Sequence, residues 1–591
     1  MANGKWLIVL LLAICYMLLA KYQSHLMVLL GLIILNLAFF GLNLNDFFLS
    51  DDFDWLTIAK SEEYSLSDYF SANYYGERGD GGSYRPMVNV IFWLNYNLFS
   101  LNPLGYHIVN LFFHIGVCFL VYLLALALFE KLKNKNKIAI LAAAFFAILP
   151  NHSEAVIWIA AVGDPLATFF YLLAFYLYLL FRQKQNFSAL LVSIASFIIV
   201  LLIKEIAITL PLLIVVWELY QAISKNKFKA RNLVLYPLGY WLLVIGYFFI
   251  RYSAIGLVFG YYARESFKID FNAVFKMIAA LISNLFFYGQ TRVFLIDYFS
   301  DHKIFFVLLI ILLAALILYA CRRYFYKAAF LIDAYLILIL PVIFLAFNNL
   351  NDEGERYNYL PSVAFVILLS LLIWQMPENK IFKKPSIDPL TWLPPSLLLR
   401  RTGRMTARAV VIGVLIIYFA VNLFNKDYNW HLASSLSKKI VQQDAPQVLD
   451  LGRENYFVAL PDNLDGAPLL RNGLVLGINL FYPELEFKAK VLNVYQCLTR
   501  QNYQEKILYW GAYPTGGWIA ETFDKKNRVT GFDRQETDQY IFELWNYDYP
   551  TYTSNTIRLI FKNKEGNFIP AGKEDFNIII FDQGSLKSLA K

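Results

Sequence analysis

Residues 26–54 read LMVLLGLIILNLAFFGLNLNDFFLSDDFD, an apolar run that ends in an acidic cluster. The run Leu26–Leu44 is long enough to cross a membrane as a helix, which needs about 20 residues. Asp51, Asp52 and Asp54 follow it after a short gap. Carboxylates just outside a membrane span are costly to keep unless something uses them. The stretch therefore predicts a first membrane helix with a candidate catalytic loop at its end, and a solvated surface loop is the simpler alternative.

Composition extends the membrane prediction to most of the chain. Of its 591 residues, 58% are hydrophobic and only 16% are charged, and the mean hydropathy is +0.49. A soluble globular domain is far less apolar. We expect an all-α polytopic membrane domain of about 11 to 13 transmembrane helices, with the short run Trp6–Ala20 as an optional extra span. After the first run, the expected spans are Tyr106–Phe129, Ile138–Pro150, Pro165–Phe181, Phe187–Ile203, Ile206–Tyr220, Leu233–Tyr252, Ile304–Ala320, Ala328–Phe347, Ser362–Met376 and Ala409–Phe424.

Basic residues orient these spans, because cytoplasmic loops collect Lys and Arg. Clusters at 131–137 and 225–231, and the arginine-rich segment Pro377–Arg408, fall on one side when spans are counted alternately. The acidic cluster and everything after Phe424 then lie outside. The net charge of +8 reflects this asymmetry and requires no nucleic acid. The stretch Phe271–Ser300 begins and ends outside, so we expect an interfacial or re-entrant helix there, and two short crossings are the alternative.

The chain after residue 425 is more polar and predicts a separate unit. Turn residues separate strand-like stretches, which are Leu474–Phe481, Lys506–Trp510, Ile541–Trp545, Thr556–Phe561 and Phe576–Ile580. We expect helices at Trp430–Gln443 and around Glu484–Thr499. The expected parts are a membrane catalytic domain at 1–425 with its first outer loop at 45–105, a linker helix at 426–445, and an extracytoplasmic β-rich or α/β domain at 446–591.

The adjacent Asp51 and Asp52 are the candidate general base. In an extended loop they point to different sides, so only one can be the principal proton acceptor. A carboxylate base contributes about 10²- to 10⁴-fold when its pKa suits the reaction. Alternatively, Asp52 or Asp54 caps a helix over Trp55–Lys60. Asp52 and Asp54 could also hold a divalent cation, although no further ligand is in view.

Other polar residues lie on the same predicted side. Glu154 is suited to placing a substrate, with His152 bonded to it or to a phosphate, or both belong to a cap at a span junction. Lys204 is suited to a lipid phosphate or to an interfacial ion pair. Arg356 and Arg85 are suited to a bidentate phosphate contact. The alternative for either arginine is a salt bridge to an acidic neighbour.

Several motifs in fixed order carry a resemblance over about residues 45 to 435. They are Tyr84-Arg85-Pro86, Leu101-Asn102-Pro103-Leu104-Gly105-Tyr106-His107, Pro150-Asn151-His152-Ser153-Glu154, Gly163-Asp164, Lys204-Glu205 and Glu355-Arg356-Tyr357-Asn358-Tyr359-Leu360-Pro361. This series resembles the membrane half of the transmembrane and tetratricopeptide-repeat-containing protein O-mannosyltransferases. These belong to the GT-C superfamily of polyprenyl-phosphate-sugar-dependent glycosyltransferases.

The resemblance implies an inverting transfer of mannose or another hexose from a polyprenyl-phosphate-linked donor on the outer membrane face. Asp51 or Asp52 would deprotonate the acceptor hydroxyl, and Glu154 would help to place a substrate. Cations would stabilise the leaving phosphate, so no metal cofactor is required. The substrate-binding residues implied in this way are Arg85, His152, Lys204, Arg356 and Tyr359.

The C-terminal part departs from these relatives. It lacks tetratricopeptide repeats and resembles instead the small outer domains of prokaryotic members, which predicts a prokaryotic plasma membrane protein. The acceptor therefore stays open between protein Ser/Thr, a glycan and a lipid. Two other classes compete with an enzyme, namely a lipid-linked-glycan transporter or flippase, which should carry ionisable residues deep within its spans, and a membrane scaffold with a binding ectodomain.

Overall fold

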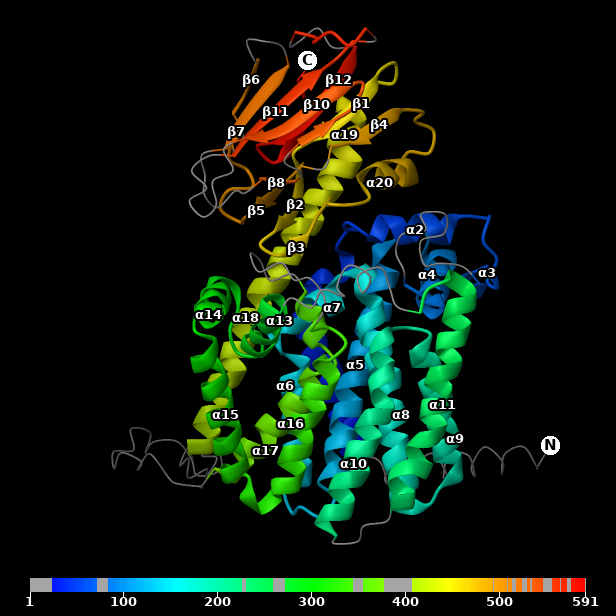
Figure 1. Ribbon diagram of the computed structural model, residues 1–591, viewed down its shortest axis with the longest axis vertical. Helices are drawn as coiled ribbons and strands as arrows, with labels where there is room; N and C mark the ends of the chain where they lie inside the picture. The colour runs from blue at the N-terminus through cyan, green and yellow to red at the C-terminus, as the bar shows by residue number, and fades with distance from the viewer. Residues whose placement is uncertain are drawn as a thin grey trace, which may run out of the picture.

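The computed structural model of the chain describes most of the sequence. The described residues are 24–71, 83–225, 230–258, 271–343, 354–376, 407–492, 494–506, 509–512, 517–522, 529–531, 534–545, 555–563, 565–570 and 575–589. The run Trp6–Ala20 and most of the segment Pro377–Arg408 lie outside them. Figure 1 shows an upright helical bundle with a strand-rich region above it.

Each of the 11 expected spans coincides with a helix in the bundle. These helices are Ser24–Asn45, α5 (Pro103–Leu128), α6 (Lys135–Ala147), α8 (Gly163–Lys184), α9 (Phe187–Leu201), α10 (Leu210–Ser224), α11 (Ala230–Ile255), α15 (Lys303–Ala320), α16 (Phe325–Ile339), α17 (Ser362–Gln375) and α18 (Ala407–Lys439). Among the described residues, seven helices are long and apolar enough to cross a membrane, or eight if α6 and the helix after its 55° bend count as one. This is fewer than predicted, because α6, α9, α16 and α17 are 13 to 15 residues long. The chain is a multi-pass integral membrane protein.

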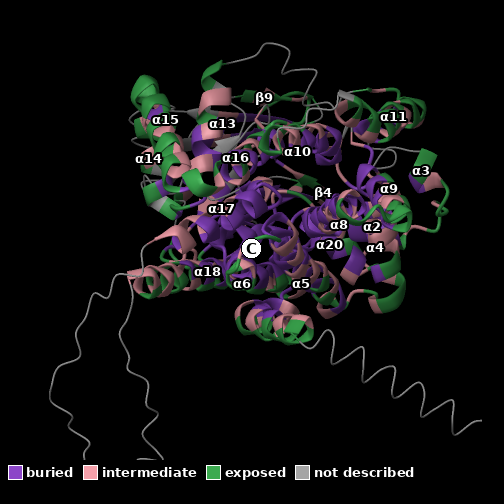
Figure 2. Cartoon of the chain, turned by 90° about the horizontal axis from the view of Figure 1, so that it is seen from below, coloured by how far each residue is buried: buried purple, intermediate pink, exposed green. Residues whose placement is uncertain are grey.

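The packing of the bundle separates a buried centre from a lipid-facing rim. In Figure 2 the buried residues gather in α5, α6, α8 and α17, whereas α11 and α15 are largely exposed. Only 6% of the apolar window of α15 is buried. An apolar helix this exposed is compatible with lipid rather than with water.

Short elements cover the end of the bundle that faces the strand-rich region. They are α2 (Asp52–Lys60), α3 (Asp68–Ser71), α4 (Pro86–Phe99), α7 (Ser153–Ile157), η4 (Ile159–Val162), η5 (Glu205–Thr209), η7 (Glu355–Asn358), α13 (Phe271–Ser283) and α14 (Gly289–Asp301). The single helix expected within Phe271–Ser300 is in fact the pair α13 and α14, which lies at this end (Figure 1).

Helix α18 links the two parts of the chain without a break. It runs for 33 residues and continues through a π-helical turn at Ile440–Asp444 into α19 (Ala445–Val448). The linker helix expected at Trp430–Gln443 is thus the continuation of the helix that contains the last span. In Figure 1 it rises from the bundle into the strand-rich region.

Three small sheets form the C-terminal region, with strand orders β13-β12-β1-β4, β6-β7-β11-β10-β9 and β3-β2-β5-β8. The strands are β1 (Glu454–Val458), β2 (Leu460–Leu464), β3 (Ala467–Pro468), β4 (Lys488–Val491), β5 (Val494–Leu498), β6 (Tyr509–Ala512), β7 (Trp518–Thr522), β8 (Val529–Gly531), β9 (Arg534–Glu536), β10 (Tyr540–Trp545), β11 (Asn555–Phe561), β12 (Phe576–Asp582) and β13 (Ser585–Ser588). In the first sheet, β1 pairs in parallel with both β12 and β4. The predicted strand-rich character of this region is confirmed.

Two elements were predicted with the wrong type. Leu474–Phe481 is a helix, α20, because a short apolar run does not distinguish strand from helix by its periodicity. The helix expected around Glu484–Thr499 is replaced by β4 and β5. Burial along β4 alternates with a period of two, which is the pattern of a strand.

The basic ends of the bundle helices test the orientation of the chain. Lys135 begins α6, and Arg182 and Lys184 lie in the last turn of α8; these helix ends lie opposite the C-terminal region (Figure 1). In a cysteine-free background, we expect Glu565→Cys to react with a membrane-impermeant maleimide in intact cells. Lys133→Cys, which is also exposed, should react only after permeabilisation. Labelling of both in intact cells would contradict the positive-inside orientation.

Candidate active site

The first outer loop enters α2 through Asp52, whose side chain is buried. Its Oδ2 accepts a hydrogen bond from the backbone N–H of Leu49 (2.8 Å) and its Oδ1 from that of Ala160 (2.7 Å). Burial raises the pKa of Asp52 well above its usual range, and these N–H donors act in the opposite direction. Since both oxygens are bonded to backbone groups, Asp52 anchors the loop to η4. The helix begins at Asp52 itself and both donors lie outside it, so the structure does not show the predicted helix cap by Asp52.

Asp51 is only partly buried and faces a different set of groups. Its Oδ1 accepts a hydrogen bond from Asn472 Nδ2 at 2.9 Å. The loop that carries it contacts Trp158, because Trp158 Nε1 donates to the carbonyl oxygen of Leu49 at 3.4 Å. The guanidinium of Arg356 lies 4.6 Å from the centre of the same Trp158 ring. Of the two adjacent aspartates, Asp51 is therefore the more accessible one, and its charge acts on the partly buried Arg356.

The alternative cation site at Asp52 and Asp54 finds little support. Asp54 is buried in α2, and the two oxygens of Asp52 are already hydrogen-bonded. Within the described ranges, no three His, Cys, Asp or Glu side chains are grouped so that they could hold a metal ion.

Glu154, in α7, forms a buried ion pair with Arg356, in η7. Glu154 Oε1 accepts from Arg356 Nη1 at 2.7 Å, and Oε2 accepts from the backbone N–H of Arg356 at 3.0 Å. Only 3% of the Glu154 side chain and 24% of the Arg356 side chain are exposed. Burial acts against the charge of the guanidinium, but the negative charges around it, with Glu154 first and Asp164 and Asp51 among them, raise the pKa of Arg356. Arg356 is therefore a permanent cation at this site.

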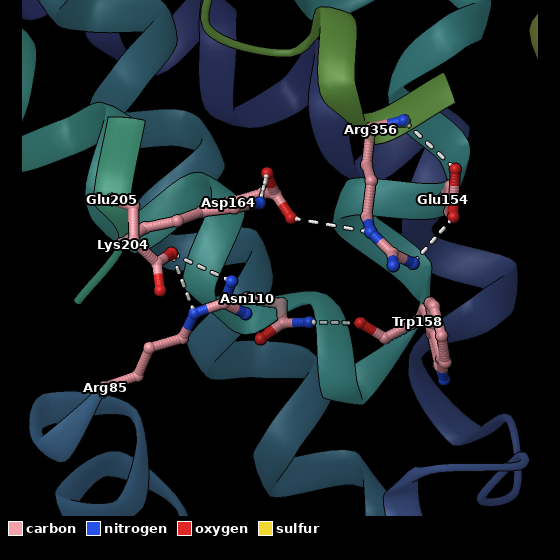
Figure 3. A network of polar contacts seen from close by, with 8 residues as sticks. All are labelled: Arg85, Asn110, Glu154, Trp158, Asp164, Lys204, Glu205 and Arg356. Atoms are coloured by element: carbon pink, nitrogen blue, oxygen red, sulfur yellow. Dashed lines mark hydrogen bonds and ion pairs between the residues drawn. The ribbon is translucent and has the colours of Figure 1, made fainter. Parts of the chain in front are cut away.

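Figure 3 shows that this pair belongs to a row of alternating charges. Asp164, in the first turn of α8, accepts a hydrogen bond from Lys204 and lies 4.0 Å from Arg356 Nε. Burial lowers the pKa of Lys204, and the carboxylate of Asp164 opposes this effect. The row Glu154, Arg356, Asp164, Lys204 thereby joins α7, η7, α8 and the start of η5.

A second group of ion pairs begins at the next residue, Glu205. Its Oε2 accepts from Arg85 Nη2 at 2.9 Å and its Oε1 from Arg251 Nη1 at 3.2 Å. The Arg85 side chain is 30% exposed, whereas only 3% of Arg251 is exposed. Together the two groups contain the cations Arg85, Lys204, Arg251 and Arg356 and the carboxylates Glu154, Asp164 and Glu205.

Two candidate substrate-binding residues, His152 and Tyr359, lie in the protein core. His152 Nε2 lies 2.9 Å from Ser362 Oγ, and its ring centre is 4.6 Å from that of Tyr359. The Tyr359 hydroxyl lies 2.5 Å from His114 Nδ1. Both side chains are fully buried, and His152 Nε2 and the Tyr359 hydroxyl contact polar groups of Ser362 and His114. Their placement supports a packing role and not the predicted contact with substrate.

Three residues of the site were not singled out from the sequence, namely Trp158, Lys426 and Asn472. Lys426 pairs with Glu355, and its position just after the last apolar run is a signal that could have identified it. Trp158 and Asn472 carry no such local signal. Each of them contacts a residue that is distant in the sequence, so only the folded chain shows their position.

The different surroundings of the two aspartates predict different effects on stability. Asp52→Asn replaces one acceptor oxygen by an N–H₂ group that faces a backbone donor, so we expect it to lower the free energy of unfolding by about 1–3 kcal/mol. Asp51→Asn should change it by less than about 0.5 kcal/mol. Thermal unfolding of the purified proteins in detergent, followed by tryptophan fluorescence, measures the difference. Equal unfolding temperatures would contradict the anchoring role of Asp52.

The chain is similar to solved structures in its fold and to curated proteins in its sequence. No model of a known protein family matches the chain. Among solved structures, ArnT from Cupriavidus metallidurans in the apo state has a TM-score of 0.41 at 13% identity and covers 84% of this chain and 97% of its own. The oligosaccharyltransferase of Archaeoglobus fulgidus in the apo form has a TM-score of 0.40 at 11% identity, over 93% of this chain and 77% of its own.

Curated relatives share sequence with part of the chain. Protein O-mannosyl-transferase F38B6.6 of Caenorhabditis elegans is 26% identical over 57% of this chain and 49% of its own length. Protein O-mannosyl-transferase Tmtc1 of Drosophila melanogaster is 36% identical over 23% of this chain and 16% of its own length. Human protein O-mannosyl-transferase TMTC3 is 30% identical over 27% of this chain and 17% of its own length. The chain thus spans about half or less of the length of these relatives. The predicted resemblance is confirmed: in sequence, part of the chain is similar to the protein O-mannosyltransferases.

Proposed function

We propose that the chain is an inverting membrane glycosyltransferase. It moves a sugar from a polyprenyl-phosphate-linked donor to a hydroxyl acceptor on the extracytoplasmic membrane face. The observation that carries this proposal is the accessible Asp51 on the loop that contacts Trp158, together with Arg356 on the same Trp158 ring and Lys204 in the same row of charges. The names of the curated relatives make mannose the first sugar to test and a protein Ser/Thr hydroxyl the first acceptor. Hydroxyls of glycans and lipids are the next acceptors.

Asp51 is the general base in this proposal. Its carboxylate takes the proton of the acceptor hydroxyl while the hydroxyl oxygen attacks the anomeric carbon. The bond between that carbon and the phosphate oxygen breaks on the opposite face, and its electron pair stays on the phosphate. A single displacement of this kind inverts the anomeric configuration.

Arg356 and Lys204 stabilise the leaving phosphate. Preorganised cations in a partly buried site stabilise developing negative charge more strongly than water does. The two carboxylate oxygens of Glu154 hold the backbone and the guanidinium of Arg356. Glu154 therefore acts through Arg356, as a positioning residue. The lipid tail of the donor lies among the apolar helices of the bundle, and the acceptor arrives from the aqueous side.

Removal of the base is the direct test. We expect purified wild-type protein to transfer label from a polyprenyl-phosphate mannose, and Asp51→Asn to lower kcat by at least about 100-fold without unfolding the protein. Asp68→Asn is the matched control, because the Asp68 carboxylate bonds to Ser65 within the same loop. If Asp51→Asn keeps transfer within about threefold of wild type, Asp51 is not the base. If no donor from a panel of polyprenyl-phosphate sugars is used, the proposed function fails.

The cations of the site predict transfer without a metal ion. Arg356 and Lys204 supply positive charge where a metal would act on the phosphate. We therefore expect the initial rate of transfer to change by less than about twofold in excess EDTA. A loss of activity that Mg²⁺ or Mn²⁺ restores would contradict this expectation and would reopen the cation site at Asp52 and Asp54.

A further inference from the structure

The C-terminal region contacts the first outer loop exactly where that loop carries Asp51. The backbone N–H of Ser50 donates to the carbonyl oxygen of Leu469 at 2.7 Å. The side-chain amide of Asn472 donates to Asp51 Oδ1 at 2.9 Å. Both partners belong to the connection between β3 and α20. The two contacts thus join one segment of the C-terminal region to two consecutive residues of the membrane part.

Gly473 allows this close approach. Its φ of +83° lies in the left-handed region that favours glycine. A Cβ atom at this position would lie 2.6 Å from the carbonyl oxygen of Ser50 and 2.9 Å from Phe53 Cβ. The contact therefore requires a residue without a side chain, next to the asparagine that reaches Asp51.

Helix α20 holds the segment in place against α2 and the residues before it. The ring of Phe481, at the end of α20, lies 5.1 Å from that of Phe47 and 6.4 Å from that of Phe48. Gly477 brings the helix so close that an added Cβ would be 3.0 Å from the Phe53 ring. Aromatic packing at this distance fixes the orientation of both partners. Asn472 immediately precedes Gly473, the N-cap of α20, so the packing of this helix also fixes the position of Asn472.

Ser50 shows that the loop conformation depends on these contacts. Its φ of +46° is unusual for a residue other than glycine, and such conformations persist only where the surroundings determine them. The hydrogen bond from Ser50 to Leu469 is one such constraint. The direction of the Asp51 side chain follows from the backbone of Ser50, so the C-terminal region helps to set it.

The C-terminal region also forms one wall of a small pocket at the site. The membrane side of this pocket includes Glu154, Lys426 and Trp430, and the other side is Asp465 and Gly466, from the turn between β2 and β3.

We propose that Asn472 is a positioning residue for Asp51 and that the segment Leu469–Gly473 completes the acceptor side of the active site. This inference rests on the proposed glycosyltransferase function. The amide of Asn472 (2.9 Å) and, at the longer distance of 3.3 Å, the hydroxyl of Ser50 both donate to Oδ1, and no hydrogen bond to Oδ2 of Asp51 occurs among the described residues. Oδ2 is thus the oxygen that takes the proton from the acceptor.

The test compares kcat with the KM of each substrate. We expect Asn472→Ala to lower kcat for transfer by about tenfold or more, which is the effect of losing a hydrogen bond to a charged group. The KM for the polyprenyl-phosphate donor should stay within about twofold, because Arg356 and Lys204 are unchanged. Asn472→Gln keeps an amide donor on an exposed residue and should recover most of kcat. If Asn472 were needed only for folding, its loss would not lower kcat while leaving the donor KM unchanged, and Asn472→Gln would not restore kcat.

Asn567→Ala is the matched control. The hydrogen bonds of Asn567 stay within its own turn, to Asn563 and Glu565, so transfer should be unchanged. If Asn472→Ala transfers at the wild-type rate while Asp51→Asn is inactive, the positioning role is overturned and the proposed function stands. If Asn472→Ala and Asn472→Gln lose activity together with their unfolding temperature, the role is structural and the inference also fails. If the wild type uses no donor, the proposed function itself has failed.

Discussion

The ion pair between Glu154 and Arg356 is the contact on which the arrangement of the site depends. The two residues lie 202 positions apart, on α7 and η7, and their pair is largely withdrawn from water. Removing one partner of a buried pair typically costs about 3–5 kcal/mol, because the other charge is left unpaired. Arg356 also stacks on Trp158 and approaches Asp164. The pair therefore holds η7 against α7, against Trp158 and against the first turn of α8.

A second set of contacts ties α18 to the same end of the bundle. Lys426 pairs with Glu355, and His431 lies 2.6 Å from Asp46, just after the first span. These side chains lie where the last helix leaves the apolar part of the bundle, and the buried charges of Lys426, Glu355 and Asp46 are paired within the protein. Because α18 continues directly into the C-terminal region, this region is held both by a continuous helix and by the packing of α20. Both attachments are near Asp51.

The sequence predicted the parts of the molecule that depend on local pattern. Apolar runs marked the helices of the bundle, and charges at their ends marked Glu154, Lys204 and Arg356, which the structure brings into one row. The prediction was less successful where the secondary structure of a segment, or the role of a side chain, depends on contacts with residues distant in the sequence. Leu474–Phe481 is an apolar run that periodicity does not assign to strand or helix. In the folded chain it is a helix, in which Gly477 packs on the ring of Phe53 and Phe481 packs on Phe47. His152 has the chemistry of a ligand-binding residue, but its side chain is fully buried and its Nε2 contacts the hydroxyl of Ser362.

The same limit explains why the sequence left the choice between two adjacent aspartates open. Both sit at the start of α2, where free backbone N–H groups favour carboxylates. Consecutive helical residues point about 100° apart, so one side chain turns inward and the other outward. Asp52 turns back to Leu49: its carboxylate accepts from the Leu49 N–H and its own N–H donates to the Leu49 carbonyl, while its other oxygen accepts from the Ala160 N–H. Asp51 faces Asn472 and remains partly exposed to water. Of the two adjacent aspartates, Asp52 therefore anchors the loop and Asp51 is the accessible carboxylate.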